Sequence, residues 1–188
     1  AVTHRVRKPA PPPERLAEIR ALALDCDGVL TRADLYYDET GRRMLRFDAR
    51  DGFGLAALTR TAGVPVAVIS GRRADIAELR LRELGVAYFA SECSDKAEGL
   101  VRICRQIGIE PAQCAYVGDD LPDLRAFHHA GFRIAVADAA PEVIAAADWV
   151  TERCGGCGAV REVCEAILKA KGVWQRILEK LGSREDTR

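Results

Sequence analysis

The stretch Ala21-Leu22-Ala23-Leu24-Asp25-Cys26-Asp27-Gly28 joins four apolar residues to two aspartates and a glycine. Four consecutive apolar residues predict a strand that is buried on both faces, as in a parallel sheet. Burying carboxylates at the end of such a strand is costly unless a cation or a reaction requires them. The stretch therefore predicts both a buried strand over 21–24 and a functional site directly after it.

Further apolar, β-prone runs follow at 64–69, 114–117 and 134–137. Stretches with helical spacing separate them, and these cover residues 54–61, 74–84, 96–107 and 122–130. Alternation of strands and helices predicts an α/β fold with right-handed crossovers. We therefore expect a Rossmann-like, three-layer architecture built around a parallel sheet.

Composition restricts the classes of partner. Lysine plus arginine and aspartate plus glutamate each total 28, so no net field favours nucleic acid or an anionic membrane. Seven cysteines, an odd number scattered through apolar segments, suit a reducing compartment, so we expect a cytoplasmic protein. Basic residues near the N-terminus run into Pro9–Pro13 instead of an apolar segment, and no apolar run is long enough to cross a membrane.

Three regions are expected along the chain. Residues 1–19 combine a mobile proline-rich arm with a short helical lead-in over 14–19, residues 20–170 form the core, and residues 171–188 form a C-terminal tail. Within the core, residues 32–48 interrupt the alternation and predict a projecting β-hairpin around Gly41. A hairpin cannot bury its two tyrosines alone, so we expect it to pack against another subunit.

Polar residues follow each predicted strand, where the ligand site of a parallel sheet lies. They comprise Asp25 and Asp27, Ser70-Gly71-Arg72, and Gly118-Asp119-Asp120 with Asp123 one helical turn on, and Lys96 opens the intervening helix. Several carboxylates so close together require a divalent cation, and oxygen-only ligands favour Mg²⁺. With donors from Ser70 and Lys96, the site suits a phosphoryl group that Asp25 attacks while Asp27 protonates the leaving alcohol.

These motifs, in this order, resemble those of the phosphatases of the haloacid dehalogenase superfamily. The resemblance implies Asp25 as nucleophile, Asp27 as acid/base, and magnesium ligation by Asp25, Asp119 and the backbone carbonyl of Asp27. It also implies that Ser70, Gly71 and Lys96 hold the phosphate. A carboxylate at position 27 distinguishes phosphatases from the dehalogenases and ion pumps of the superfamily.

Other motifs resemble a capless subgroup, which acts on phosphates of 3-deoxy-2-keto sugar acids. These motifs are Phe47-x-x-Arg50-Asp51-Gly52, Ser94-Asp95-Lys96 and Gly155-Gly156-x-Gly158-Ala159-Val160-Arg161-Glu162. Only 25 residues separate Ser70 from Lys96, which leaves no room for a cap domain. The resemblance implies a homotetramer, with Arg50 and Arg72 as candidates for the carboxylate of the sugar acid.

One departure from the subgroup stands beside the phosphate motif. Glu92-Cys93 occupies positions where the subgroup commonly carries Gly-Gln. We expect hydrolysis of an eight-carbon sugar-acid 8-phosphate, a precursor of the lipopolysaccharide inner core. Two alternatives stay open, namely a nine-carbon, sialic-acid-type 9-phosphate as the substrate and a non-catalytic assembly module of a sugar-acid cytidylyltransferase.

Overall fold

A six-stranded parallel sheet forms the centre of the computed structural model, which describes residues 8–73 and 75–182. Each strand pairs with its neighbours in parallel orientation. In spatial order the strands are β5 (Tyr88–Ala90), β4 (Val66–Ile69), β1 (Ala21–Leu24), β6 (Cys114–Gly118), β7 (Phe132–Ala135) and β8 (Trp149–Val150).

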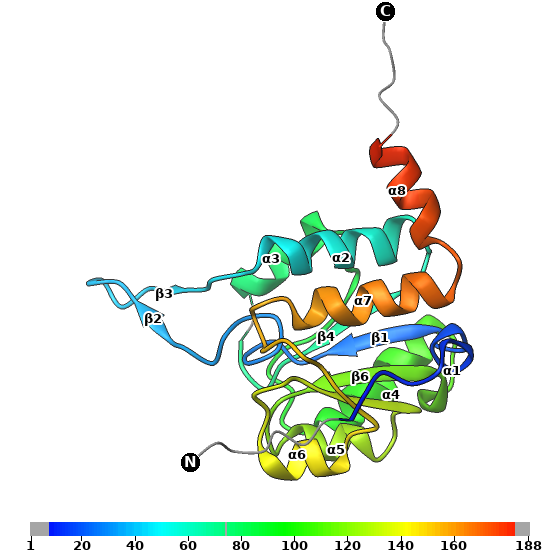
Figure 1. Ribbon diagram of the computed structural model, residues 1–188. Helices are drawn as coiled ribbons and strands as arrows, with labels where there is room; N and C mark the ends of the chain where they lie inside the picture. The colour runs from blue at the N-terminus through cyan, green and yellow to red at the C-terminus, as the bar shows by residue number, and fades with distance from the viewer. Residues whose placement is uncertain (1–7, 74, 183–188) are drawn as a thin grey trace, which may run out of the picture.

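Helices cover both faces of this sheet and complete three layers (Figure 1). One face carries α2 (Ala49–Arg60), α3 (Asp75–Glu83) and α7 (Ala159–Ala170), and the other carries α4 (Lys96–Ile107), α5 (Asp123–Phe127) and α6 (Pro141–Ala146). The remaining helical segments are α1 (Pro13–Ala17), the 3-10 turn η1 (Pro111–Gln113) and α8 (Trp174–Gly182).

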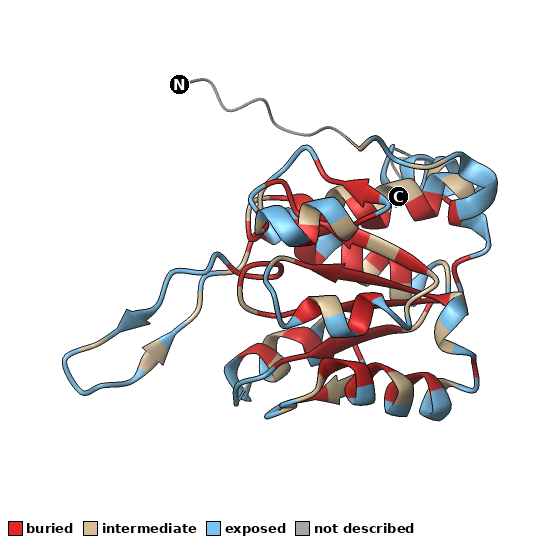
Figure 2. Ribbon diagram, turned by 90° about the horizontal axis from the view of Figure 1, so that it is seen from below, coloured by how far each residue is buried: buried red, intermediate tan, exposed pale blue. Residues whose placement is uncertain are grey.

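Burial explains why the strands have an uninterrupted apolar sequence. Every residue of β1, β4 and β6 is buried, and these strands appear red along the middle of the molecule (Figure 2). Helices exclude water from both faces of the sheet. These strands therefore lack the alternation of apolar and polar residues that a half-exposed strand shows. The predicted α/β class with a parallel three-layer sheet is confirmed.

The predicted hairpin is present and projects away from the core (Figures 1 and 2). Its strands β2 (Tyr36–Tyr37) and β3 (Arg43–Met44) pair antiparallel and are shorter than the runs expected from the sequence. Asp38 stabilises the turn, since its Oδ1 accepts hydrogen bonds from the N–H groups of Thr40 and Arg42 at 2.9 and 2.8 Å. Between Ser70 and Lys96 the described residues form α3 and β5 and no cap domain.

The two ends of the described chain contact the core. Residues 1–7 of the predicted proline-rich arm lie outside the described residues, whereas the carbonyl of Lys8 accepts a hydrogen bond from Val150 N–H at 2.9 Å. The Lys8 ammonium donates to the carbonyls of Ala145 and Ala147 at 2.6 and 2.7 Å. At the other end, α8 buries Ile177, so part of the predicted tail is helical.

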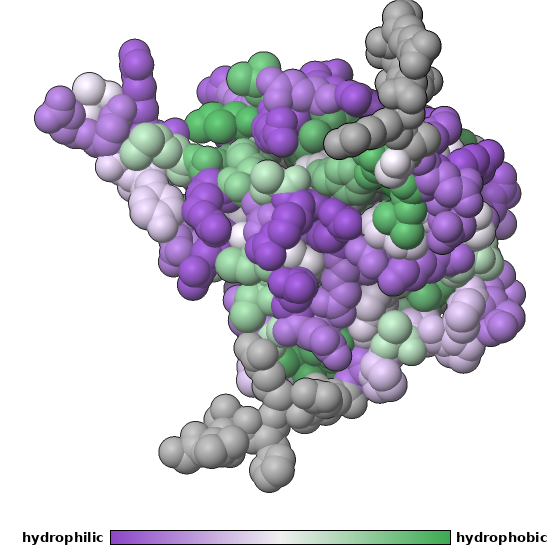
Figure 3. Space-filling view, turned by 45° about the horizontal axis from the view of Figure 1, so that its top comes forward, coloured by the Kyte–Doolittle hydropathy of each residue, from purple (hydrophilic) through white to green (hydrophobic). Residues whose placement is uncertain are grey.

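One face of the molecule is mainly hydrophilic (Figure 3). Hydrophilic side chains cover most of the face shown in Figure 3, with apolar groups scattered between them. Among the helices of the described residues, none combines the length and apolar character that crossing a membrane requires.

Candidate active site

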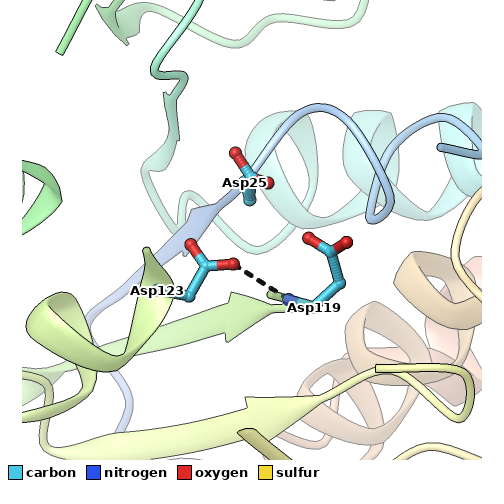
Figure 4. Close-up of side chains that lie close together, drawn as sticks. All are labelled: Asp25, Asp119 and Asp123. Carbon is cyan, nitrogen blue, oxygen red and sulfur yellow. Dashed lines mark hydrogen bonds between the residues drawn. The ribbon is translucent and has the colours of Figure 1, made fainter. Parts of the chain in front are cut away.

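Functional side chains from separate segments meet at the carboxyl end of the sheet. Asp25 follows β1 and Asp119 follows β6, while Asp123 begins α5, and the three carboxylates lie close together (Figure 4). One carboxylate oxygen from each of the three residues lies within 4.8 Å of the other two. The structure therefore brings Asp25, Asp119 and Asp123 together at the edge of the sheet where the sequence placed them.

Lys96 joins two of these carboxylates. Its ammonium lies 2.8 Å from Asp25 Oδ1 and 2.6 Å from Asp123 Oδ1. Lys96 is the first residue of α4, where the side chain of Asp95 caps the helix by accepting from Ala97 N–H at 2.9 Å. The capped helix start therefore places a buried positive charge between Asp25 and Asp123.

Asp123 is fully buried and organises the loop after β6. Its Oδ1 also accepts a hydrogen bond from the Tyr116 hydroxyl at 2.7 Å, and its Oδ2 accepts from the N–H groups of Asp119 and Asp120 at 2.9 and 3.2 Å. Spacing within Gly118-Asp119-Asp120-x-x-Asp123 showed that Asp123 belongs to the motif, but not that it would hold Lys96.

Two glycines of the motifs, Gly28 and Gly155, lie so close to neighbouring atoms that a side chain would not fit. Gly28 has a φ of 98°, and a Cβ there would lie 2.0 Å from Asp119 Oδ2. A Cβ on Gly155 would lie 1.6 Å from the carbonyl oxygen of Gly28, so the Gly155-Gly156 loop packs directly on the turn that carries Asp27. A side chain at position 28 would therefore collide with Asp119, and one at position 155 would collide with the backbone of Gly28.

Burial and mutual repulsion disfavour the charged forms of the acids. Burial raises the pKa of Asp119 to about 9, with added repulsion from Asp25 and Asp123. Burial and Asp123 likewise raise the pKa of Asp25 to about 6, although Lys96 opposes this. Burial lowers the pKa of Lys96, but the carboxylates of Asp25 and Asp123 outweigh it and raise that pKa above its ordinary value. The positive charge of Lys96 is therefore too small to stabilise all three carboxylates in their ionised forms.

The donor set fits a magnesium ion. Three carboxylates face one ammonium, so full ionisation leaves two uncompensated negative charges, which one divalent cation neutralises. Asp119 Oδ1 is buried without a hydrogen-bond partner among the described residues, as expected for an atom that ligates a metal. Carboxylate oxygens are also the ligands that magnesium prefers.

Two other predicted acids have different surroundings. The side chain of Asp27 is 23% exposed and forms an ion pair with Arg43 of the hairpin, with its Oδ1 2.5 Å from the guanidinium. Metal ligation by the backbone carbonyl of Asp27 stays a prediction. Asp120 is exposed and its Oδ1 accepts from Leu121 N–H at 2.8 Å, so we do not assign it to the metal.

Ser70 follows β4, the neighbour of β1, and is buried. Its N–H donates to the carbonyl of Ala90 at 2.8 Å and its Oγ accepts from Arg72 N–H at 3.2 Å, which fixes the turn containing Gly71. This geometry presents Ser70 at the same edge as Asp25. The phosphate-binding roles of Ser70 and Gly71 stay predictions.

The two arginines predicted to bind substrate lie in different environments. Arg50 donates to both carboxylate oxygens of Asp48, from Nε at 3.0 Å and from the terminal nitrogen at 2.6 Å, and its side chain is 57% exposed. It also lines a cavity of about 540 Å³ along α7, which does not include the acidic cluster. Arg72 is exposed beside Ser70.

Sequence comparison identifies relatives over most of the chain. Residues 60–158 match the family of haloacid dehalogenase-like hydrolases. The 3-deoxy-D-manno-octulosonate 8-phosphate phosphatase of Salmonella typhi is 41% identical over 154 residues, which are 82% of this chain and 81% of that protein.

Solved structures give the same result. The 3-deoxy-D-manno-octulosonate 8-phosphate phosphatase of Moraxella catarrhalis, in complex with a magnesium ion, a phosphate ion and KDO, matches with a TM-score of 0.86 and 38% identity over 90% of this chain and 97% of that one. The cobalt-bound phosphatase of Haemophilus influenzae matches with a TM-score of 0.81 and 39% identity over 85% and 93% of the two chains. Together with the acidic cluster, these matches show that the chain belongs to the haloacid dehalogenase-like hydrolases and is a phosphoric monoester hydrolase.

Proposed function

We propose that the protein hydrolyses 3-deoxy-D-manno-octulosonate 8-phosphate to the free sugar acid and inorganic phosphate, with magnesium as cofactor. The observation that carries the proposal is the position of Asp25, which is buried at the end of β1 between Lys96 and Asp119. Relatives that match most of the chain carry this activity in their names. The product would enter synthesis of the lipopolysaccharide inner core.

The first step forms a covalent intermediate on Asp25. The Lys96 ammonium forms an ion pair with Oδ1 of Asp25. The other carboxylate oxygen, Oδ2, therefore attacks phosphorus and forms an aspartyl-phosphate. The bond between phosphorus and the sugar oxygen breaks, and Asp27 donates to that oxygen a proton held on Oδ2, since its Oδ1 accepts from Arg43. The sugar acid leaves as a neutral alcohol at its C8 hydroxyl.

The second step hydrolyses the intermediate. Asp27 takes a proton from water as the water oxygen attacks phosphorus, and the bond between phosphorus and Asp25 breaks. Inorganic phosphate is released, and both aspartates return to their starting protonation states. The same residue therefore serves as acid in one step and as base in the next.

Positive charge and hydrogen-bond donors support both steps. Asp25, Asp119 and the backbone carbonyl of Asp27 would hold magnesium, which when bound supplies positive charge to the phosphoryl oxygens. The Lys96 ammonium and the Ser70 hydroxyl bind the remaining phosphoryl oxygens, because both groups are buried at the same edge of the sheet. Asp123 holds Lys96 in place.

The test measures phosphate release from the 8-phosphate with magnesium present. Asp25→Asn removes the nucleophile, so we expect activity to fall on the order of 10³-fold or more. Asp120→Asn is the matched control, because this neighbouring acid is exposed, and it should retain activity within about threefold of wild type.

A direct comparison of substrates tests the specificity. We expect a higher kcat/KM for the eight-carbon 8-phosphate than for a nine-carbon, sialic-acid-type 9-phosphate. Preference for the nine-carbon substrate would replace the proposed substrate with the alternative one. Wild-type protein that releases no phosphate from either compound would contradict an enzymatic role and favour an assembly module.

The proposal includes a cytoplasmic homotetramer assembled through the hairpin. Apolar residues gather on this otherwise unsupported element, where Leu35, Tyr36, Tyr37 and Met44 are between 44% and 60% exposed. Cys26, Cys104, Cys114 and Cys164 are free thiols buried in the core, which suits a reducing compartment.

A further inference from the structure

Arg43 connects the hairpin to the active-site rim. From strand β3 its guanidinium reaches Oδ1 of Asp27 at 2.5 Å, and the two side chains are only 19% and 23% exposed. Asp27 is the residue to which we assign proton transfer to the leaving sugar. The positive charge of Arg43 therefore lies beside the place where the sugar acid departs.

One N–H donor of the Arg43 guanidinium is not used within the described part of the protein. Its terminal nitrogen contacts Asp27, but its Nε is buried and has no hydrogen-bond partner in the part of the chain that the structure describes. A buried donor without an acceptor is energetically unfavourable. An oxyanion that arrives with the substrate would satisfy this atom.

The other candidate arginines are less well placed for this task. The guanidinium of Arg50 donates from two of its nitrogens to the two carboxylate oxygens of Asp48, so these donors are already used within the protein. Arg72 is exposed beside the phosphate-binding turn. Arg43 instead combines partial burial, a contact with Asp27 and a free donor.

We propose that Arg43 is a specificity-determining residue that binds the carboxylate of the sugar-acid leaving group through Nε while its terminal nitrogen holds Asp27. The inference rests on the proposed function, since it requires a substrate that carries a carboxylate as well as a phosphate. A planar guanidinium suits this task because it can contact two carboxylates from different nitrogens. Selection for an acidic sugar is thereby linked to the position of the proton donor.

The experiment compares Arg43→Ala with wild type on two kinds of phosphate ester. For the octulosonate 8-phosphate we expect kcat/KM to fall about 10- to 100-fold, mainly through KM, as expected for the loss of one charge-assisted hydrogen bond. For glucose 6-phosphate, which lacks a carboxylate, only the contact of Arg43 with Asp27 is lost, so kcat/KM should fall by at least about fivefold less than for the octulosonate 8-phosphate. Arg43→Lys, which keeps the charge, should restore part of the selectivity.

Arg42→Ala is the matched control, because Arg42 is the exposed neighbour of Arg43 on the same hairpin. It should leave both substrates unaffected. Circular dichroism and light scattering on each variant establish that fold and assembly match wild type. Equal losses on both esters in Arg43→Ala would overturn the inference, since Arg43 would then act only through Asp27 or the hairpin.

The wild-type measurements separate the two hypotheses. Wild-type protein without preference for the sugar-acid phosphate would overturn the proposed substrate, and the assignment of Arg43 with it. Wild-type protein that prefers the sugar-acid phosphate, together with an Arg43→Ala variant that keeps the same preference, would overturn the assignment of Arg43 alone.

Discussion

Glu92 has a left-handed backbone conformation, with a φ of 52°, beside the phosphate-binding turn. Its N–H donates to the carbonyl of Arg72 at 3.1 Å, and the next residue, Cys93, donates to the carbonyl of Ser70 at 3.0 Å. These bonds tie the loop before Lys96 to the turn after β4. They therefore hold Glu92 in a conformation that costs a residue with a Cβ about 1–2 kcal/mol.

We predict that Glu92→Gly stabilises the protein by about 0.5–1 kcal/mol. Glycine removes the conformational strain, and the greater freedom of glycine in the unfolded chain offsets part of the gain. Urea denaturation measures the change. Glu92→Ala is the control, because alanine keeps the Cβ, and it should give no comparable gain; equal stabilisation by both variants would contradict the explanation by strain.

At the scale of elements, Asp51 joins α2 to the start of α7. It is buried, and its carboxylate accepts hydrogen bonds from the N–H groups of Gly158 and Arg161 at 3.3 and 2.6 Å. These N–H groups lie at the N-terminus of α7, where a helix favours an anion. Burial nevertheless raises the pKa of Asp51 from 3.8 to about 6.

The sign of this shift predicts how stability depends on pH. Because the folded state binds the Asp51 proton more tightly than the unfolded state, stability from this group is present below pH 3.8 and is lost as pH rises through about 6. The difference between the two pKa values corresponds to about 3 kcal/mol. We therefore subtract the free energy of unfolding of Asp51→Asn from that of wild type. This difference should fall by up to about 3 kcal/mol as the pH rises through this range.

Urea denaturation of both proteins at several pH values between about 3 and 7, roughly one unit either side of the two pKa values, measures this difference. Subtracting Asp51→Asn removes the contribution of the other titrating groups that the two proteins share. A difference that stays constant with pH, or that rises, would show that the N–H groups of α7 outweigh the cost of burial.

The fold could be predicted from the sequence where the apolar pattern was long and bounded by motifs. The runs at 21–24 and 114–117 became the buried strands β1 and β6, and the helix over 96–107 has the predicted bounds. The runs at 64–69 and 134–137 gave the right strands with shifted ends. Edge strand β8 was not predicted, and the sequence allowed one strand between Ser70 and Lys96 without locating β5, because two or three residues carry too little pattern to identify a strand.

The acidic cluster could be predicted because parallel strands align their carboxyl ends. Motif spacing alone placed Asp25, Asp119 and Lys96 near one another. It could not reveal that Asp123 would bind Lys96, or that Arg43 would return from the hairpin to Asp27. Both contacts depend on side-chain directions and on the path of a loop, which residue spacing does not determine.

At the scale of the whole molecule, the hairpin is the element that the core supports least. A two-stranded hairpin is marginal in water by itself, yet this one exposes Tyr36, Tyr37 and Met44 to between 47% and 60%. Its base is nevertheless attached to the core, through the bridge between Thr31 and Phe47 and through the contact of Arg43 with Asp27. A change in how the hairpin is held can therefore reach the active site.

We predict that replacing Tyr36 and Tyr37 together with serine shifts the proposed homotetramer towards smaller species, because the double variant removes the largest apolar side chains from the proposed interface. Light scattering measures the mass. Leu79→Ser is the control, since Leu79 is 70% exposed on α3, which is not part of the hairpin, and should leave the mass unchanged. Wild-type protein that is already a monomer would contradict the proposed assembly. A double variant that remains tetrameric would instead place the interface on another surface, and the tyrosines would need a different explanation.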